Sequence, residues 1–157
     1  MRLSLFNAAA PELTWYVVND NVMGGRSEGD FQLADGVLEF SGVTNTRGGG
    51  FSSIRTQPSE LGLSSQQQIV LCAHGDGRCY VFRLEDNRGI AFWADFVPTA
   101  DSLGEVTIDL ASFRPRFRGR WLDGPTLVPD RVVALGLMCY DGSDGPFRLK
   151  VGSIEAR

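Results

Sequence analysis

The stretch "CYVFRLEDNRGIAFWADFV", residues 79–97, holds two runs of alternating apolar side chains separated by "DNRG". A period of two is the pattern of a β-strand that buries one face. The runs predict strands at 79–85 and 90–97, and the side chains predicted to face the core are Tyr80, Phe82, Leu84, Ile90, Phe92, Ala94 and Phe96. This stretch therefore predicts two paired strands that cover a hydrophobic core.

The same pattern recurs along the chain, where short runs rich in Val, Ile, Phe, Tyr and Leu are separated by Gly, Asp, Asn, Ser and Pro. In the run at 37–42 the inward pair is Leu38 and Phe40. Further strands are predicted at 14–18, 31–34, 50–56, 67–73, 105–110, 132–140 and 147–156. Strands this numerous predict an all-β fold, and we expect one domain over residues 1–157 that forms a jelly-roll β-sandwich.

Composition narrows the function classes. The 157 residues include 43% hydrophobic residues, enough for one sizeable core, and carry a net charge of -4. Because a general nucleic-acid binder carries excess positive charge, we expect no nucleic-acid partner. No segment is apolar enough for a secretory signal or a membrane span, so we expect a cytoplasmic protein without membrane insertion.

The three cysteines are an odd number without CxxC spacing, which is typical of a reducing compartment. A tight hairpin around "AHGDGR" would place Cys72 opposite Cys79 on neighbouring strands. Such a pair lies within reach of a disulfide, but we expect both thiols to stay reduced.

The outward faces of the strands at 79–85 and 90–97 carry Arg83, Trp93 and Asp95. If these strands pair, Arg83 lies near Trp93 and Asp95 and forms a cation-π contact and a charge pair. Two interpretations remain open: a stabilising surface cluster on a solvated sheet face, or a platform for a ligand.

A basic segment, "ASFRPRFRGRWLDGPTLVP", occupies residues 111–129. Its arginines and aromatic residues alternate as Phe113, Arg114, Arg116, Phe117, Arg118, Arg120 and Trp121. Single-strand nucleic-acid binders combine the same residue types, but one short segment on an acidic chain is weak support. We predict a long loop on the rim of the sandwich that is available for partner contact.

The residues offer little for catalysis, and we expect a non-enzymatic protein with no cofactor and no metal. His74 is the only histidine, and we expect it to form hydrogen bonds in a turn rather than act as a base. The spacing of Cys72, His74, Cys79 and Cys139 matches no zinc pattern, and "RGGGFSS" lacks the lysine of a phosphate-binding loop. A calcium site in "DGSDG", residues 141–145, has only weak support.

Several motifs together resemble the complex I intermediate-associated protein 30 family. They are "WYVVNDNVMGGRSEGDF", "LEFSGVTNTRGGGFSSIRT", "HGDGRCYVFRL", "FRPRFRGR" and "GPFRLKVGSIEA", and they extend from about Trp15 to Ala156. The resemblance implies a galactose-binding-like jelly roll without catalytic residues. It also implies a role in assembling respiratory complex I or a related NDH-type or photosynthetic membrane complex.

The positions that match the family motifs are Trp15, Asp20, Met23, Gly24, Gly25, Ser27, Gly49, Gly50, Phe51, Arg55, Gly75, Asp76, Gly77, Arg78, Tyr80, Phe117, Arg118 and Gly119. Asp20 can accept hydrogen bonds from backbone N–H groups or an arginine, and Met23 is expected to insert into the sandwich. We expect Asp20, Arg55, Arg78 and Arg118 to converge on one side of the fold.

Two functions follow as hypotheses. The first is an assembly factor that holds protein subunits of a membrane-associated electron-transfer complex, and the second is a module that binds a carbohydrate or small ligand. The candidate binding residues for either are Asp20, Asn21, Arg26, Arg55, Asp76, Arg78, Arg83, Trp93, Asp95 and Arg118.

Overall fold

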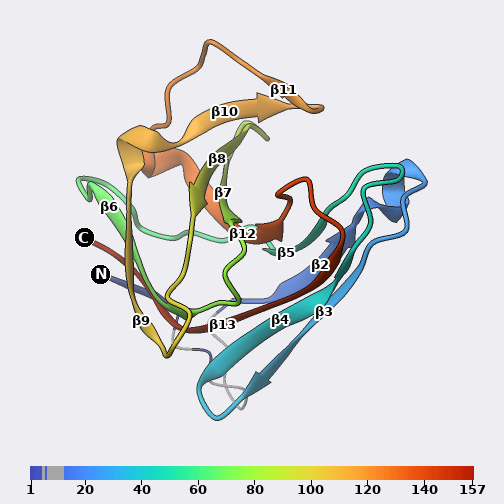
Figure 1. The fold of residues 1–157 in the computed structure, drawn as a ribbon. Coiled ribbons are helices and arrows are strands. Elements are labelled where there is room, and N and C mark those ends of the chain that lie inside the picture. Colours follow the sequence, from blue (N-terminus) through green and yellow to red (C-terminus); the bar gives the residue numbers. More distant parts are fainter. Residues whose placement is uncertain (5, 7–12) are drawn as a thin grey trace.

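The chain folds into two antiparallel β-sheets that pack face to face (Figure 1). The computed structural model describes residues 1–4, 6 and 13–157, with the side chain of Met23 outside the described part, so the prediction for Met23 stays a prediction. This architecture confirms the predicted all-β jelly-roll sandwich.

The first sheet has the strand order β3-β4-β13-β6-β9, and β1 also pairs with β13. Its strands are β1 (Arg2–Ser4), β3 (Glu28–Ala34), β4 (Val37–Thr44), β6 (Gln68–His74), β9 (Gly104–Asp109) and β13 (Gly145–Ala156). The long strand β13 lies in the centre, so the first sheet is organised around the last strand of the chain.

The second sheet has the strand order β11-β10-β8-β7-β12-β5-β2. Its strands are β2 (Trp15–Asn19), β5 (Ser52–Thr56), β7 (Tyr80–Asp86), β8 (Ala91–Phe96), β10 (Arg114–Phe117), β11 (Arg120–Trp121) and β12 (Val132–Cys139). Every strand predicted from the period-two pattern is present, with ends shifted by a few residues.

The hydrophobic core lies between the sheets, as the alternation predicted. Leu38 and Phe40 of the first sheet and Phe82, Leu84 and Phe92 of the second are fully buried. Burial of a large apolar side chain contributes roughly 1.5–3 kcal/mol, so these facing rows supply much of the stability. The alternate residues of these strands point away from the core and form the outward face of the second sheet.

The predicted hairpin around "AHGDGR" was wrong. Strand β6 pairs with β13 and β9, whereas β7 pairs with β8 and β12, so Cys72 and Cys79 belong to segments of different sheets. The connection crosses between the sheets, as jelly-roll connections do. It is held where the Gly75 N–H donates to the Thr99 carbonyl at 2.8 Å. Cys72, Cys79 and Cys139 are free thiols.

The predicted loop in the basic segment was also wrong in part. Residues 114–121 form the β10–β11 hairpin, which pairs with β8 and extends the second sheet (Figure 1). Arg118 and Gly119 form its two-residue turn with φ angles of 49° and 78°. Positive φ at both positions is what a tight hairpin turn matching the twist of the strands requires.

The helical elements of the described residues are the short 3-10 turns η1 (Asp20–Met23), η2 (Leu110–Ser112) and η3 (Pro129–Arg131). Among the residues that the structure describes, no helix has the length and apolar character needed to cross a membrane.

Candidate functional site: an arginine groove

The outward face of the second sheet carries a row of large polar and aromatic side chains. Antiparallel register aligns cross-strand neighbours in the order Tyr16, Arg55, Gly136, Arg83, Trp93 and Arg114. Cross-strand neighbours on one face are in contact range, so the register alone brings these side chains together.

A groove of about 530 Å³ lies over this row. We call it the arginine groove, and its lining consists of Gly49, Phe51, Arg55, Arg83, Gly89, Ala91, Trp93, Arg116, Phe117, Arg118, Gly119 and Tyr140. A volume of this size falls within the range of small-molecule sites in proteins. Its walls come from the sheet, the β10–β11 hairpin and the segments before β5 and after β12.

Gly136 lets two arginines lie side by side at the base of the groove. A Cβ at this position would lie 3.2 Å from the Cβ of Arg83 and 3.3 Å from the carbonyl oxygen of Ile54. These approaches are closer than ordinary van der Waals contact. The glycine therefore leaves room above β12 for the side chains of Arg55 and Arg83.

Arg116 is the centre of an aromatic cluster. Its guanidinium carbon lies 4.4 Å from the ring centroid of Trp93, 4.6 Å from that of Trp121 and 5.8 Å from that of Tyr140. Trp93 also makes edge contacts with Trp121 and Tyr140, each at 6.0 Å between centroids. Cation-π and edge-to-face contacts fix these side chains in orientation, so one wall of the groove is preorganised.

The groove is electrostatically positive. Burial and the neighbouring charge of Arg83 lower the pKa of Arg55 to about 10. Arg83, 8% exposed, forms an ion pair with Glu85 at 3.0 Å. The predicted charge pair with Asp95 was therefore wrong: Asp95 lies opposite Val81, and the cation over Trp93 is Arg116 rather than Arg83.

Three nitrogen donors at this face are buried without a hydrogen-bond partner in the described part of the chain. They are Arg55 Nε, Trp93 Nε1 and Arg116 Nε. An unpaired buried donor costs on the order of 1–3 kcal/mol, so native proteins keep few of them. All three belong to side chains that line the arginine groove.

Asp20 does not reach the groove but forms a buried carboxylate centre beneath the loops. Its side chain is fully buried and accepts hydrogen bonds from Ser27 N at 2.9 Å, Ser27 Oγ at 2.7 Å, Gly50 N at 2.8 Å and Phe51 N at 3.3 Å. Ser27 belongs to the loop 20–27, and Gly50 and Phe51 belong to the loop 45–51. Asp20 therefore joins the two loops.

The paired glycines of these loops permit that arrangement. A Cβ on Gly25 would lie 2.3 Å from Asp20 Cγ, and one on Gly49 would lie 2.6 Å from Asp20 Cβ. Both distances are shorter than real contacts, so neither position accepts a side chain while Asp20 stays in place.

The Asp20 centre also positions one wall of the groove. Phe51 follows the bonded Gly50 and packs edge-on against Tyr140 at 6.0 Å between ring centroids. Asp20 therefore acts as a positioning residue for Phe51. Asn21 and Arg26 of the same loop are exposed.

Arg78 forms a second structural centre, between the loops that join β6 to β7 and β12 to β13. It donates to Asp141 Oδ2 at 2.9 Å and Oδ1 at 2.6 Å, to Thr44 Oγ1 at 2.8 Å and to the carbonyls of Ser143, Gly145 and Pro146. The hydrogen bond from Arg78 holds the pKa of Asp141 below its usual value. Arg78 thus ties β4 to the loop before β13.

Asp76 has a similar structural role beside Arg78. Its carboxylate accepts from the buried Tyr80 hydroxyl at 3.0 Å and from the backbone N–H of Arg148 at 2.7 Å. Burial, followed by the charge of Asp76, raises the pKa of Tyr80. Asp76 therefore joins β7 to β13 across the two sheets.

Of the four residues expected to converge, which are Asp20, Arg55, Arg78 and Arg118, two line the arginine groove. Arg55 and Arg118 line the arginine groove, whereas Arg78 lines a separate, shallow surface beside Pro146 and Asp20 is internal. The sequence-derived candidates Arg83 and Trp93 also lie in the groove. Asp95 is exposed on the same sheet beyond it.

Arg116 and Tyr140 were missed as site residues. A signal for Arg116 was present, because arginines at every second position from 114 to 120 follow strand periodicity, and "RG" fits a two-residue turn. Tyr140 gave no local signal, because it follows β12 and reaches the groove through strand order alone.

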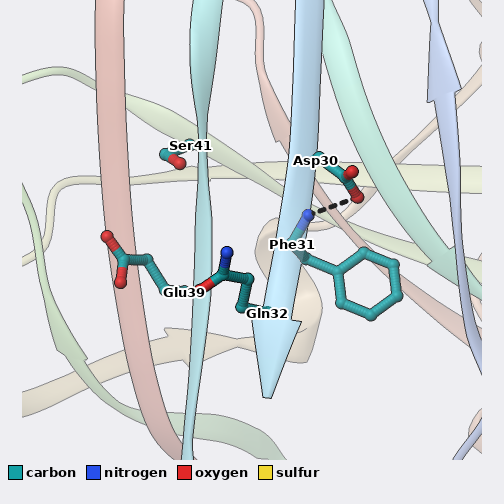
Figure 2. A pocket seen from close by; sticks show the side chains of 5 residues that line it. All are labelled: Asp30, Phe31, Gln32, Glu39 and Ser41. Carbon is teal, nitrogen blue, oxygen red and sulfur yellow. Dashed lines mark hydrogen bonds between the residues drawn. The ribbon is translucent and has the colours of Figure 1, made fainter. Parts of the chain in front are cut away.

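A smaller pocket lies on β3 and β4 of the first sheet. Figure 2 shows Gln32 beside Glu39 and the carboxylate of Asp30 bonded to Phe31 N, while the ring of Phe31 points away from Glu39. The pocket measures about 140 Å³, and Glu39 is already paired with Arg148. It lacks the unpaired donors found in the arginine groove.

The histidine and cysteine side chains considered for metal binding or catalysis do not form a metal site in the described part of the chain. Nε2 of His74 lies 2.8 Å from the carbonyl oxygen of Ala100, and no cluster of three metal-ligating side chains occurs in the described ranges. Burial raises the pKa of the Cys139 thiol to about 12 and raises that of Cys79. Such thiols are weak nucleophiles at neutral pH.

The fold is a two-sheet antiparallel β-sandwich with a groove on the outward face of one sheet. The structure is similar to the family 11 carbohydrate-binding module of a cellulosomal cellulase of Clostridium thermocellum, with a TM-score of 0.66 and 16% identity over 98% of this chain and 94% of that chain. It is also similar to a family 29 carbohydrate-binding module variant complexed with cellulohexaose, with a TM-score of 0.59 and 9% identity over 99% of this chain and 89% of that chain. An agarase, AgWH50C, matches with a TM-score of 0.63 and 12% identity over 100% of this chain and 24% of that chain.

The sequence places the chain within a family. The profile of complex I intermediate-associated protein 30 (CIA30) matches residues 4–151, and the chain belongs to this family. A search of curated proteins found no match.

Proposed function

We propose that this protein is a non-catalytic binding protein that assists the assembly of respiratory complex I or a related membrane electron-transfer complex. It acts in the cytoplasm and holds a protein subunit of that complex at the arginine groove. Membership of the CIA30 family supports the assembly role.

One observation carries the choice of the arginine groove. The buried unpaired donors Arg55 Nε, Trp93 Nε1 and Arg116 Nε all belong to its walls. Burial of polar groups without partners lowers the stability of the free protein, and sites that accept such a cost are typically functional. The Asp20 and Arg78 centres satisfy their own hydrogen bonds and need no external partner.

A second candidate function is carbohydrate binding. The similar family 11 module has been solved with a β-1,3-1,4-mixed-linked tetrasaccharide, and the groove contains aromatic rings of the kind that stack on sugars. The observation that favours this function is the exposure of two aromatic side chains, Trp121 at 45% and Phe117 at 54%.

The test is affinity purification of the tagged protein from its own organism, with subunits identified by mass spectrometry. We expect the wild-type protein to retain identified subunits of a membrane electron-transfer complex. The double variant Arg55→Met, Arg116→Gln should recover at least about tenfold less of these subunits, because a few buried anchors, often arginines, carry most of the binding energy of an interface. The matched control is Arg131→Gln, which changes an exposed arginine on η3. Equal recovery by the double variant would refute the role of the groove, and binding of the mixed-linked tetrasaccharide with no subunit recovered would favour the second function.

A further inference from the structure

The arginine groove offers hydrogen-bond donors almost without acceptors. Its described lining includes Arg55, Arg83, Arg116 and Arg118 and no carboxylate. Glu85, which lies on the same strand as Arg83, is already paired with it at 3.0 Å. A ligand that matches this lining therefore carries negative charge and accepts hydrogen bonds.

The base of the groove holds like charges close together. Arg55 and Arg83 flank Gly136 in register, and burial together with the charge of Arg83 disfavours the protonated form of Arg55. An anion placed between them would offset that repulsion. A guanidinium group binds a planar carboxylate through two parallel hydrogen bonds, which makes a carboxylate the closest geometric match.

The aromatic wall argues against a neutral sugar at the centre of the groove. Sugar hydroxyls both donate and accept hydrogen bonds and stack their rings on open aromatic faces. Here the guanidinium group of Arg116 lies 4.4 Å from the centroid of Trp93 and 4.6 Å from that of Trp121. The cation occupies the position over Trp93 where a sugar ring would stack.

The rim is apolar beside this cationic base. Phe117 is 54% exposed and Tyr140 is 37% exposed, and Phe51 packs against Tyr140. A ligand that carries apolar side chains near its carboxylate could contact these rings with them. A peptide in which acidic and apolar residues alternate is such a ligand. Such a ligand satisfies the base and the rim together.

We propose that the arginine groove binds an acidic segment of a partner protein, with a carboxylate side chain held between Arg55 and Arg83, beside Arg116, and apolar side chains of the same segment against Phe51 and Phe117. This inference rests on the proposed function in that it takes the ligand to be a protein. It adds the chemistry of the segment that is recognised.

The test titrates purified protein with an end-blocked peptide of alternating Glu and Leu and with the same peptide carrying Gln in place of Glu, followed by tryptophan fluorescence. We expect the acidic peptide to bind at least about tenfold more tightly, and its affinity to fall as salt rises from about 50 to 500 mM because exposed charges are screened. Arg55→Met and Arg116→Gln should each weaken binding about tenfold or more, while Arg131→Gln leaves it unchanged.

Equal affinity for the two peptides, or no binding of the acidic peptide at millimolar concentration, would overturn the inference. Tighter binding of an acidic oligosaccharide such as an oligogalacturonide would overturn the choice of a peptide. Arg118→Gln, on the exposed hairpin turn, serves where a change at the base prevents folding, and its loss of affinity is expected to be smaller but salt-dependent. If the acidic peptide fails to bind while subunit recovery still depends on the groove, the inference fails and the proposed function stands.

Discussion

Replacement of Asp20 by alanine is expected to lower the free energy of unfolding by about 3–5 kcal/mol, which is a large share of the stability of a typical domain. The change removes a fully buried carboxylate and leaves donors on Ser27, Gly50 and Phe51 without an acceptor. Each stranded donor loses water without gaining a partner. Urea unfolding followed by circular dichroism measures the effect.

The matched control for this change is Asp101→Ala, which alters an exposed aspartate in the turn before β9. Its expected effect is within about 0.5 kcal/mol, as for most surface substitutions. If Asp20→Ala lowers stability by less than about 1 kcal/mol, the carboxylate is not the centre that joins the two loops.

Replacement of Arg78 by methionine is expected to destabilise the protein by about 2–4 kcal/mol. The variant keeps an apolar side chain of similar length but removes the guanidinium group that bonds Asp141, Thr44 and three carbonyls. It also strands Asp141, whose side chain is 16% exposed. The same urea unfolding measurement applies.

Arg148→Met is the control for this second change, because the Arg148–Glu39 pair is exposed and should contribute less than about 1 kcal/mol. The dependence on pH gives a further readout. Arg78 lowers the pKa of Asp141 below 3.8, so its stabilisation is present above that pH and is lost as pH falls through the folded pKa. The gap between wild type and Arg78→Met should therefore narrow in acid; a gap that stays constant from neutral pH to about pH 2 would contradict the assignment.

The fold was predictable because its strands bury one face each. Period-two runs at 79–85 and 90–97 identified β7 and β8 and the correct inward side chains. Strand pairing was less accessible, because β6 and β7 are neighbours in sequence but lie in different sheets. That crossing depends on contacts of the whole sandwich, which no local pattern reports.

The candidate site was predictable only in part, because it too depends on strand pairing that no local sequence pattern reports. Arg83 and Trp93 were identified from the outward faces of two adjacent strands, and their register is now confirmed. The partner of Arg83 was misassigned, because Glu85 on the same strand and face forms the ion pair. Arg116 lies on β10 and Tyr140 directly follows β12, and the sheet order is what places them together.

The family motifs divide into residues used for folding and residues available for binding. Asp20, Gly25 and Gly49 form one interlocked centre, and Arg78 forms another. Arg55 and Arg118 instead line the arginine groove. The motif loops are thus chiefly supports that place the walls of the groove.

The most direct test of binding at the arginine groove is photo-cross-linking in cells of the source organism. Incorporation of p-benzoylphenylalanine at position 117, on the rim of the groove, should yield cross-links to an identified subunit of a membrane electron-transfer complex. The same probe at position 22, which is 71% exposed on η1, should not. Cross-links to that subunit from position 22 but not from position 117, or none from either, would contradict the account.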